Sequence, residues 1–209
     1  MYVYTFTGSM GNGKTLGMVL FAKMYQQKTG CTLYSNFGVK GSKPFTSFKD
    51  FLQIAKEPSS ILLLDECHLD IDSRNSLSNA SKYLSHMAFF LRKMRCTLML
   101  TTPLFSNVDS RFRDITYVYV PVRKDKNYFY YPIVDYQEDR LLTTKRMKRE
   151  NAISLAKEVF DTHSMVTPLE YPANKAEFDS ILVELKKTND LYYETLEKLK
   201  MVRELKQAI

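Results

Sequence analysis

The sequence predicts an α/β fold in which a mostly parallel central sheet is covered by helices. Three observations lead to this prediction. Apolar runs alternate with helical patterns up to about residue 122, a glycine-rich loop joins the first strand to the first helix, and the run 61–64 ends in two carboxylates. Alternating strands and helices are typical of parallel sheets whose strands are connected by helical crossovers.

Each expected element follows from its local pattern. Apolar and β-branched runs predict strands at Tyr2–Thr7, Cys31–Asn36, Ile61–Leu64, Thr97–Thr101 and Thr116–Val122. Helical spacing of apolar residues predicts helices at Thr15–Gln27, Phe48–Ala55 and Leu77–Met94. The run YFYYPIVDY, residues 128–136, is expected to pair with the strand at 116–122 across the polar turn RKDKN.

The chain changes character after residue 139. The stretch RLLTTKRMKRE is basic and is expected to be exposed; its basic residues are Arg140, Lys145, Arg146, Lys148 and Arg149. Beyond it, a seven-residue repeat predicts a long amphipathic helix, carried by Phe178, Leu182, Leu185, Asn189, Tyr192, Leu196 and Leu199. This helix either lies on its own domain or joins subunits as a coiled coil. We therefore expect a main domain over 1–170 and a helical segment over 171–209.

Composition narrows the class of protein. With 209 residues and 44% hydrophobic content, the chain is long enough for one sizeable core. Thirty basic against 23 acidic residues give a net charge of +7, which favours a polyanionic partner, nucleic acid before a membrane surface. Cys31, Cys67 and Cys96 form no closely spaced pair and are expected to be reduced core residues. No leader or membrane-spanning run is apparent, so a soluble chain is expected.

The glycine-rich loop has the spacing of a phosphate-binding site. Residues 8–15 match GxxxxGK[ST] in full, as Gly8, Ser9, Met10, Gly11, Asn12, Gly13, Lys14 and Thr15. Glycines at this spacing let backbone N–H groups point at phosphate oxygens, with Lys14 reaching the β and γ phosphates and Thr15 placing a hydroxyl on Mg²⁺. The N-terminus of the following helix adds positive potential. ATP with Mg²⁺ is the expected ligand.

A second motif, ILLLDECH at 61–68, supplies the acids. The apolar residues predict a buried strand, and Asp65 follows at its carboxyl end, where open α/β sheets bind ligands. Asp65 is expected to hold Mg²⁺ through water, and Glu66 to act as the general base on the attacking water. Of the histidines, His68 lies beside the acids, where a structural role is favoured, and His86 and His163 lack metal-ligand spacing.

Over residues 2–122 the chain resembles the additional-strand catalytic-glutamate branch of P-loop ATPases. The resemblance is carried by the paired acids after an apolar strand and by an extra strand between the two motifs. In that branch a polar side chain ending the next strand senses the γ-phosphate. CTLMLTTP offers Thr101 and Thr102 here, and Thr102 is our choice because Pro103 ends the strand. Many members of the branch carry Gln or Asn at this position, so the sequence departs from the pattern there.

An arginine from a neighbouring subunit can accelerate hydrolysis by about 10³ to 10⁵ in enzymes of this design. Arg74, Arg95, Arg111 and Arg113 are candidates. We favour Arg111 or Arg113, which follow the sensor strand on an expected loop.

The motifs ILLLDEC, TTPLFSNVDSRFRD and FDTHSMV resemble the zonula-occludens-toxin-like group of phage proteins, related to the FtsK and HerA ATPases. Filamentous-phage members act at the membrane, whereas soluble relatives in tectiviruses drive double-stranded DNA into a capsid. The resemblance implies a genome-packaging ATPase in the virion or host cytoplasm, forming a ring, expected to be a hexamer, with a capsid or membrane protein as a further partner.

In such a ring a basic loop would grip DNA phosphates. Either the turn with Arg123, Lys124 and Lys126 or the stretch from Arg140 to Arg149 could line the pore. Three other functions stay open from the sequence: a membrane-docked extrusion ATPase, an ATP-dependent switch, against which Glu66 argues, and a nucleotide kinase, disfavoured by the adjacent acids.

Overall fold

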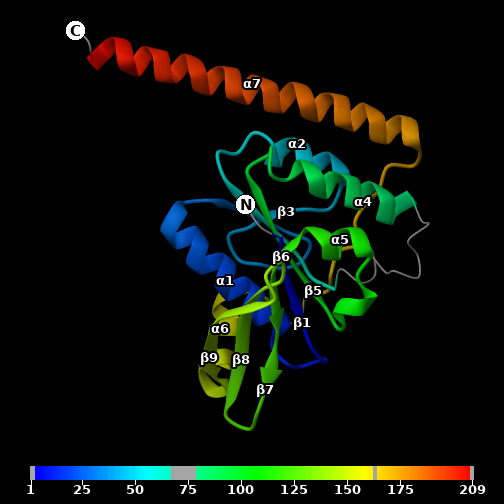
Figure 1. The fold of residues 1–209 in the computed structure, drawn as a ribbon, viewed down its shortest axis with the longest axis vertical. Coiled ribbons are helices and arrows are strands. Elements are labelled where there is room, and N and C mark those ends of the chain that lie inside the picture. Colours follow the sequence, from blue (N-terminus) through cyan, green and yellow to red (C-terminus); the bar gives the residue numbers. More distant parts are fainter. Residues whose placement is uncertain (1–2, 67–78, 162–163, 208–209) are drawn as a thin grey trace.

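The computed structural model describes residues 3–66, 79–161 and 164–207. Its sheet contains β1 (Val3–Thr7), β2 (Thr32–Ser35), β3 (Lys43–Pro44), β4 (Ser60–Leu64), β5 (Cys96–Thr102), β6 (Thr116–Pro121), β7 (Arg123–Lys124), β8 (Tyr128–Asp135) and β9 (Arg140–Lys148). The helices are α1 (Lys14–Thr29), α2 (Phe51–Ile54), α4 (Asn79–Phe90), α5 (Ser110–Ile115), α6 (Arg149–Val159) and α7 (Lys175–Gln207), with short 3₁₀ turns at Phe48–Asp50 and Phe105–Asn107. Figure 1 shows their arrangement.

The order of the strands confirms the predicted parallel sheet. Along the sheet the order is β3-β2-β4-β5-β1-β6-β8-β7, with β9 paired to β8. Every pairing from β3 to β6 is parallel. Strand β5 lies between β1, which leads into the glycine-rich loop, and β4, which leads into the acids. This is the extra strand expected between the two motifs.

Each face of the sheet carries its own core. Because side chains alternate along a strand, Leu62 and Leu64 of β4 pack in one cluster and Ile61 and Leu63 in the other. The first cluster includes buried residues of α2, α4, α5 and α7, and the second includes those of α1 and α6. Burial on both faces explains why these strands read as continuous apolar runs.

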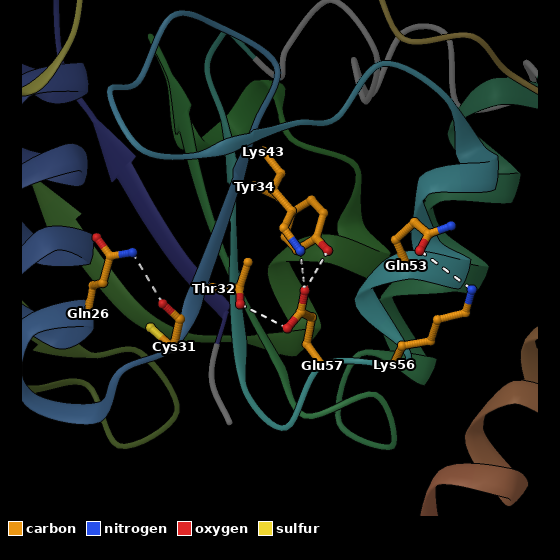
Figure 2. Close-up of polar contacts among 8 residues, drawn as sticks. All are labelled: Gln26, Cys31, Thr32, Tyr34, Lys43, Gln53, Lys56 and Glu57. Atoms are coloured by element: carbon orange, nitrogen blue, oxygen red, sulfur yellow. Dashed lines mark hydrogen bonds and ion pairs between the residues drawn. The ribbon is translucent and has the colours of Figure 1, made fainter.

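One carboxylate fixes the β2 and β3 edge of the sheet. Glu57 accepts hydrogen bonds from the hydroxyls of Thr32 (2.9 Å) and Tyr34 (3.0 Å) and from Lys43 Nζ (2.7 Å), as Figure 2 shows. Burial acts to raise the pKa of Glu57, but these three donors outweigh it and lower the pKa below its usual value. The two-residue strand β3, which the sequence does not predict, pairs with β2, and the contact between Lys43 and Glu57 adds to this pairing.

The second half of the sheet is antiparallel. Strand β8 pairs with β6, as predicted, and also with β7 and β9. The basic stretch after residue 139 is exposed as expected, and it forms the nine-residue strand β9, which the sequence analysis did not predict. The strand could not be predicted because both of its faces carry polar or charged residues, so the sequence lacks the alternation of apolar and polar residues that indicates a strand. Helix α6, also not predicted, follows it directly.

The predicted C-terminal amphipathic helix is α7, which spans 33 residues. Phe178, Ile181, Leu182 and Leu185 are buried in the core shared with α2 and α4. The later part continues past the domain (Figure 1) and leaves apolar side chains exposed, including Leu191, Leu199 and Met201. No helix among the described ranges has both the length and the apolar character that a membrane span requires.

Arg95, a sequence candidate for a trans-acting arginine, instead joins α7 to the domain. Its guanidinium stacks on the ring of Tyr192 at 3.6 Å and donates to the Asn189 side chain at 3.1 Å. It also donates to the backbone oxygens of Ala55 and Glu57. A guanidinium held by these contacts ties α7 to the domain, and the structure assigns Arg95 this structural role.

Candidate active site

The glycine-rich loop connects β1 to α1, as predicted. Gly13 is the N-cap of α1 and has φ 85°, a left-handed conformation that residues with a Cβ adopt only with strain. The N–H of Gly17 bonds to the Gly13 carbonyl at 2.9 Å, which starts the helix. The loop therefore lies at the N-terminus of α1, where backbone N–H groups and the helix dipole favour an anion.

Asp65 lies directly beside Thr15. The Thr15 hydroxyl donates to both carboxylate oxygens of Asp65, at 2.9 and 3.2 Å. The hydroxyl of Thr101, from β5, donates to the same carboxylate at 2.5 Å. Burial raises the pKa of Asp65, while the hydrogen bonds from Thr101 and Thr15 act in the opposite direction. Three segments far apart in the sequence thus converge on one carboxylate.

Glu66 is exposed and follows Asp65 in an unusual backbone conformation. Its φ is 51°, in the left-handed region that few residues with a Cβ adopt, and its N–H donates to Thr101 Oγ1 at 3.0 Å. Strained backbone held by neighbouring contacts is concentrated at functional sites. The two acids differ in exposure, since Asp65 is partly buried and Glu66 is exposed.

Asn36, which was not predicted from the sequence, holds the backbone of Asp65 in place. Its side chain accepts from the Asp65 N–H at 2.9 Å and donates to the Asp65 carbonyl at 3.3 Å. Asn36 comes directly after β2, so it is a polar residue at the carboxyl end of a buried strand. The same rule that identified Asp65 could have identified it.

The ammonium of Lys14 points back across the loop. Its Nζ donates to the Ser9 carbonyl at 3.2 Å. Burial lowers the pKa of Lys14, and the negative charges of Asp65 and Glu66 partly oppose that shift. A bound phosphate would place further negative charge beside this ammonium and favour its charged form.

These groups line one cavity of about 560 Å³, a size suited to a nucleotide. One end is formed by the loop and the start of α1, with Gly11, Gly13, Lys14 and Thr15, and a second part by Asp65, Glu66 and Thr101. The remaining wall is largely apolar and comes from segments that the sequence analysis did not connect to the site: Phe37, Phe129, Ala156, Phe160, Asp161 and Ser164.

The apolar wall is built by tertiary contacts. The Asp161 N–H bonds to the Gly38 carbonyl at 2.9 Å, and the Gly38 N–H bonds to Ser164 Oγ at 3.0 Å. The rings of Phe37 and Phe160 meet edge to face at 6.1 Å. The segment FDTHSMV, noted in the sequence for its resemblance, is therefore tied to the end of β2, with residues 162 and 163 outside the described ranges.

Thr102, chosen from the sequence as the sensor, does not line the cavity. It is fully buried and its hydroxyl donates to the Leu104 carbonyl at 3.2 Å. Because side chains alternate along β5, it is Thr101 that faces the acids. Pro103 marks where the strand ends, but a proline there does not determine which face of the strand lies towards the cavity.

Within the loop, the remaining predicted residues have different surroundings. Met10 is 90% exposed at the mouth of the cavity. The Asn12 side chain donates to the Val122 carbonyl at 3.4 Å. The Gly8 N–H bonds to the Pro103 carbonyl at 3.1 Å, which ties the loop to the residue after β5.

The favoured arginines lie on α5, a short helix, rather than on the expected loop. Arg111 forms a bidentate ion pair with the buried Asp109, at 2.8 and 2.7 Å, and this contact raises its pKa. Asp109 also caps the helix by accepting from the Arg111 N–H. Arg113 Nε is buried and has no hydrogen-bond partner among the residues that the structure describes. Neither arginine lines the cavity.

Several sequence candidates lie outside the described residues, namely Cys67, His68, Arg74 and His163. Cys31 and Cys96 are free and buried, in agreement with the expected core role. His86 packs its ring near those of Phe90 and Phe178, at 5.5 and 5.6 Å. In the described part of the chain, no group of three or more His, Cys, Asp or Glu side chains could hold a metal.

Mg²⁺ nevertheless fits the oxygen donors present. Hard oxygen ligands suit this ion, which commonly keeps several waters and uses one or two protein groups plus the phosphates of a nucleotide. The Thr15 hydroxyl and the Asp65 carboxylate lie 2.9 Å apart at the end of the phosphate loop. A carboxylate and a hydroxyl in this arrangement match such a partial ligand set.

No protein-family model matches this sequence, and no curated protein matches it either. The fold and the loop geometry define the class: the chain has the P-loop NTPase fold, with a mostly parallel sheet covered by helices. Solved structures of the same fold include the genome-packaging NTPase B204 of Sulfolobus turreted icosahedral virus 2 in complex with ATPγS. It is 13% identical over 70% of this chain and 97% of its own, with a TM-score of 0.50.

The N-terminal domain of zonular occludens toxin from Neisseria meningitidis is also similar. It is 16% identical over 85% of this chain and 97% of its own, with a TM-score of 0.52. At these identities the likeness establishes the fold.

Proposed function

We propose that this protein binds and hydrolyses ATP. The observation that carries the proposal is the convergence of Thr15 and Thr101 on Asp65 at the end of the phosphate loop. Lys14 and the loop N–H groups hold the β and γ phosphates, and Thr15 and Asp65 hold Mg²⁺, which screens the charge of the phosphates. Glu66 accepts a proton from the attacking water.

Two further assignments in the site belong to this proposal, and the geometry supports them. Thr101, in place of Thr102, orients Asp65 through its hydroxyl and accepts the N–H of Glu66, so it fixes both acids relative to the loop. The apolar wall with Phe129, Ala156 and Phe160 accommodates the base of the nucleotide, because ligand pockets bind planar rings mostly through apolar contact.

We further propose that the energy of ATP hydrolysis drives double-stranded DNA into a capsid. The structurally similar B204 is described as a genome-packaging NTPase, and the net charge of +7 suits a polyanion. The motor would be a ring, proposed to be a hexamer, with Arg111 or Arg113 reaching the site of the adjacent subunit. A capsid protein partner and a location in the virion or host cytoplasm belong to the same proposal.

ATPase assays test the first step. Wild-type protein with Mg²⁺ should release phosphate from ATP, whereas Lys14→Ala should lose nucleotide binding. Glu66→Gln should lower turnover by about 10² to 10⁴ while still binding ATP, because only the proton transfer is removed. If the wild-type protein binds nucleotide but releases no phosphate, the proposed hydrolysis is wrong and an ATP-dependent switch replaces it as the function.

A second candidate is a membrane-docked assembly or extrusion ATPase, favoured by the likeness to the zonular occludens toxin domain over 85% of this chain. The two functions differ in what stimulates hydrolysis. Double-stranded DNA should raise the ATPase rate of a packaging motor. An extrusion ATPase should respond to lipid vesicles or a membrane partner and not to DNA.

A further inference from the structure

The two basic clusters recognised in the sequence meet on one sheet. In β8 and β9, Tyr130 pairs with Arg146 and Tyr128 pairs with Lys148, while Arg123 of β7 pairs with Tyr130 from the other side. Directly paired residues of antiparallel strands project from the same face. Arg123, Arg146 and Lys148 therefore share one face of the β7–β8–β9 sheet, and all three are exposed. We call these three residues the basic sheet face.

The aromatic side chains on this face are engaged in supporting the charges. Arg146 lies over the ring of Tyr128 at 5.3 Å, and the Tyr130 hydroxyl donates to Asp125 at 2.6 Å. A ring already covered by a guanidinium offers less surface to a nucleic-acid base. The arrangement thus favours contact with phosphates over stacking of unpaired bases.

A shallow depression of about 290 Å³ continues the positive surface towards the start of α6. Lys126, Lys148 and Arg149 line it together with one acid, Glu150. The other nearby acid, Asp125, is committed to the turn, since its carboxylate accepts the N–H groups of Asn127 and Tyr128 at 2.7 Å. The net charge of this surface stays positive when Glu150 and Asp125 are included.

The opposite face of the same sheet contacts the phosphate loop. Lys124 Nζ donates to the Gly11 carbonyl at 3.0 Å, and the Tyr131 hydroxyl donates to the Gly13 carbonyl at 3.2 Å. The ring of Phe129 is so near that a Cβ on Gly13 would come within 3.0 Å of it. A three-stranded sheet thus separates the nucleotide loop from the basic sheet face.

We propose that the basic sheet face binds the phosphate backbone of double-stranded DNA, independently of sequence. The inference rests on the proposed function in naming DNA as the polyanion, and it deepens that function by assigning the contact surface. Because β7 and β8 contact the phosphate loop from their other face, DNA bound here lies one sheet away from the nucleotide.

The test is binding of a fluorescent duplex of random sequence, measured by anisotropy at several salt concentrations, with the triple variant R123Q/R146Q/K148Q. Each lost phosphate contact should reduce the slope of log K against log salt by about one, so the triple variant should lose about three and bind at least tenfold more weakly. The matched control K186Q/K187Q/K198Q removes the same charge from exposed positions of α7 and should bind like wild type.

The variant R123K/R146K keeps the positive charge and should retain duplex binding. Circular dichroism of every variant checks that a loss of binding does not come from a folding defect. An unchanged affinity in the Gln triple variant, or an equal loss in the α7 control, overturns the proposal. So does binding confined to phosphatidylserine vesicles. Basal ATPase is measured in parallel: a variant that hydrolyses ATP as wild type but no longer binds duplex supports the surface, whereas absent hydrolysis with intact duplex binding sinks the proposed ATPase alone.

Discussion

The Thr101 hydroxyl donates to Asp65 at 2.5 Å, which links strand β5 to the acid at the end of its neighbour β4. The same oxygen accepts the N–H of Glu66 at 3.0 Å. One side chain therefore sets the positions of both acids. The next residue, Thr102, has its hydroxyl on the Leu104 carbonyl and takes no part in this arrangement.

Replacing Thr101 by valine should lower the ATPase turnover. The change keeps the shape of the side chain but removes one hydrogen bond to a carboxylate and leaves the Glu66 N–H without its acceptor. Hydrogen bonds to charged groups are worth about 1.5 to 3 kcal/mol, which corresponds to a loss of about tenfold to a hundredfold if expressed in the transition state.

The matched control is Thr102→Val, measured under saturating ATP and Mg²⁺. It removes a buried hydroxyl of equal size on the other side of the strand, so its turnover should stay near that of the wild type. A larger loss in the Thr102 variant than in the Thr101 variant would restore the assignment made from the sequence.

Asp65→Asn should stabilise the nucleotide-free protein at neutral pH. Burial raises the folded-state pKa of Asp65 above the unfolded value, so the folded state holds its proton to higher pH than the unfolded state. The stability from this group is present below the unfolded pKa and is lost as pH rises through the folded pKa. The melting temperature of the variant should therefore exceed that of the wild type at about pH 8, by a margin that shrinks towards about pH 4.

With ATP and Mg²⁺ the wild type should melt at the same temperature as the variant or above it, because only the wild type gains stability from the ligands. A variant that melts below the wild type at every pH without nucleotide would show that the hydrogen bonds to Asp65 outweigh its burial.

Arg111 and Arg113 can be tested by mixing subunits. An Arg111→Ala subunit retains Glu66, and a Glu66→Gln subunit retains Arg111, so a mixed ring contains some complete interfaces if the arginine acts on a neighbour. At equal amounts about a quarter of the interfaces are complete, and ATPase activity should reappear although each variant alone is inactive.

The same mixing is repeated with Arg113→Ala, and the arginine that gives recovery is the one acting between subunits. Full activity of both arginine variants on their own would remove the hypothesis. The ion pair between Arg111 and Asp109 makes Asp109→Asn a useful companion, because it should weaken the positioning of Arg111 without removing its charge.

Arg95→Ala should destabilise the attachment of α7. The variant loses the stacking on Tyr192 and the hydrogen bonds to Asn189 and to three backbone carbonyls, those of Ala55, Glu57 and Lys93. We expect the free energy of unfolding to fall by about 2 kcal/mol. Urea denaturation measures it, with the exposed neighbour Arg92→Ala as the control, which should change it by less than about 0.5 kcal/mol.

Much of the fold could be predicted because its signals are local. The buried strands have apolar runs long enough to be recognised, and α1 follows a complete glycine-rich motif. Strand β9 and helix α6 could not be predicted in this way, since β9 has no apolar face and is held by its pairing with β8. In the site, the motifs identified Lys14, Thr15, Asp65 and Glu66, whereas Asn36 and Phe160 reach it through the packing of distant segments.

The sequence by itself determined the phosphate loop and the acid pair, because each is a contiguous motif whose geometry depends on neighbouring residues. Only the tertiary structure decided that Thr101 faces the acids, that Arg95 clamps α7, and that the two basic clusters share one sheet face. Those relationships depend on strand register and on contacts between segments far apart in the chain, which no local pattern encodes.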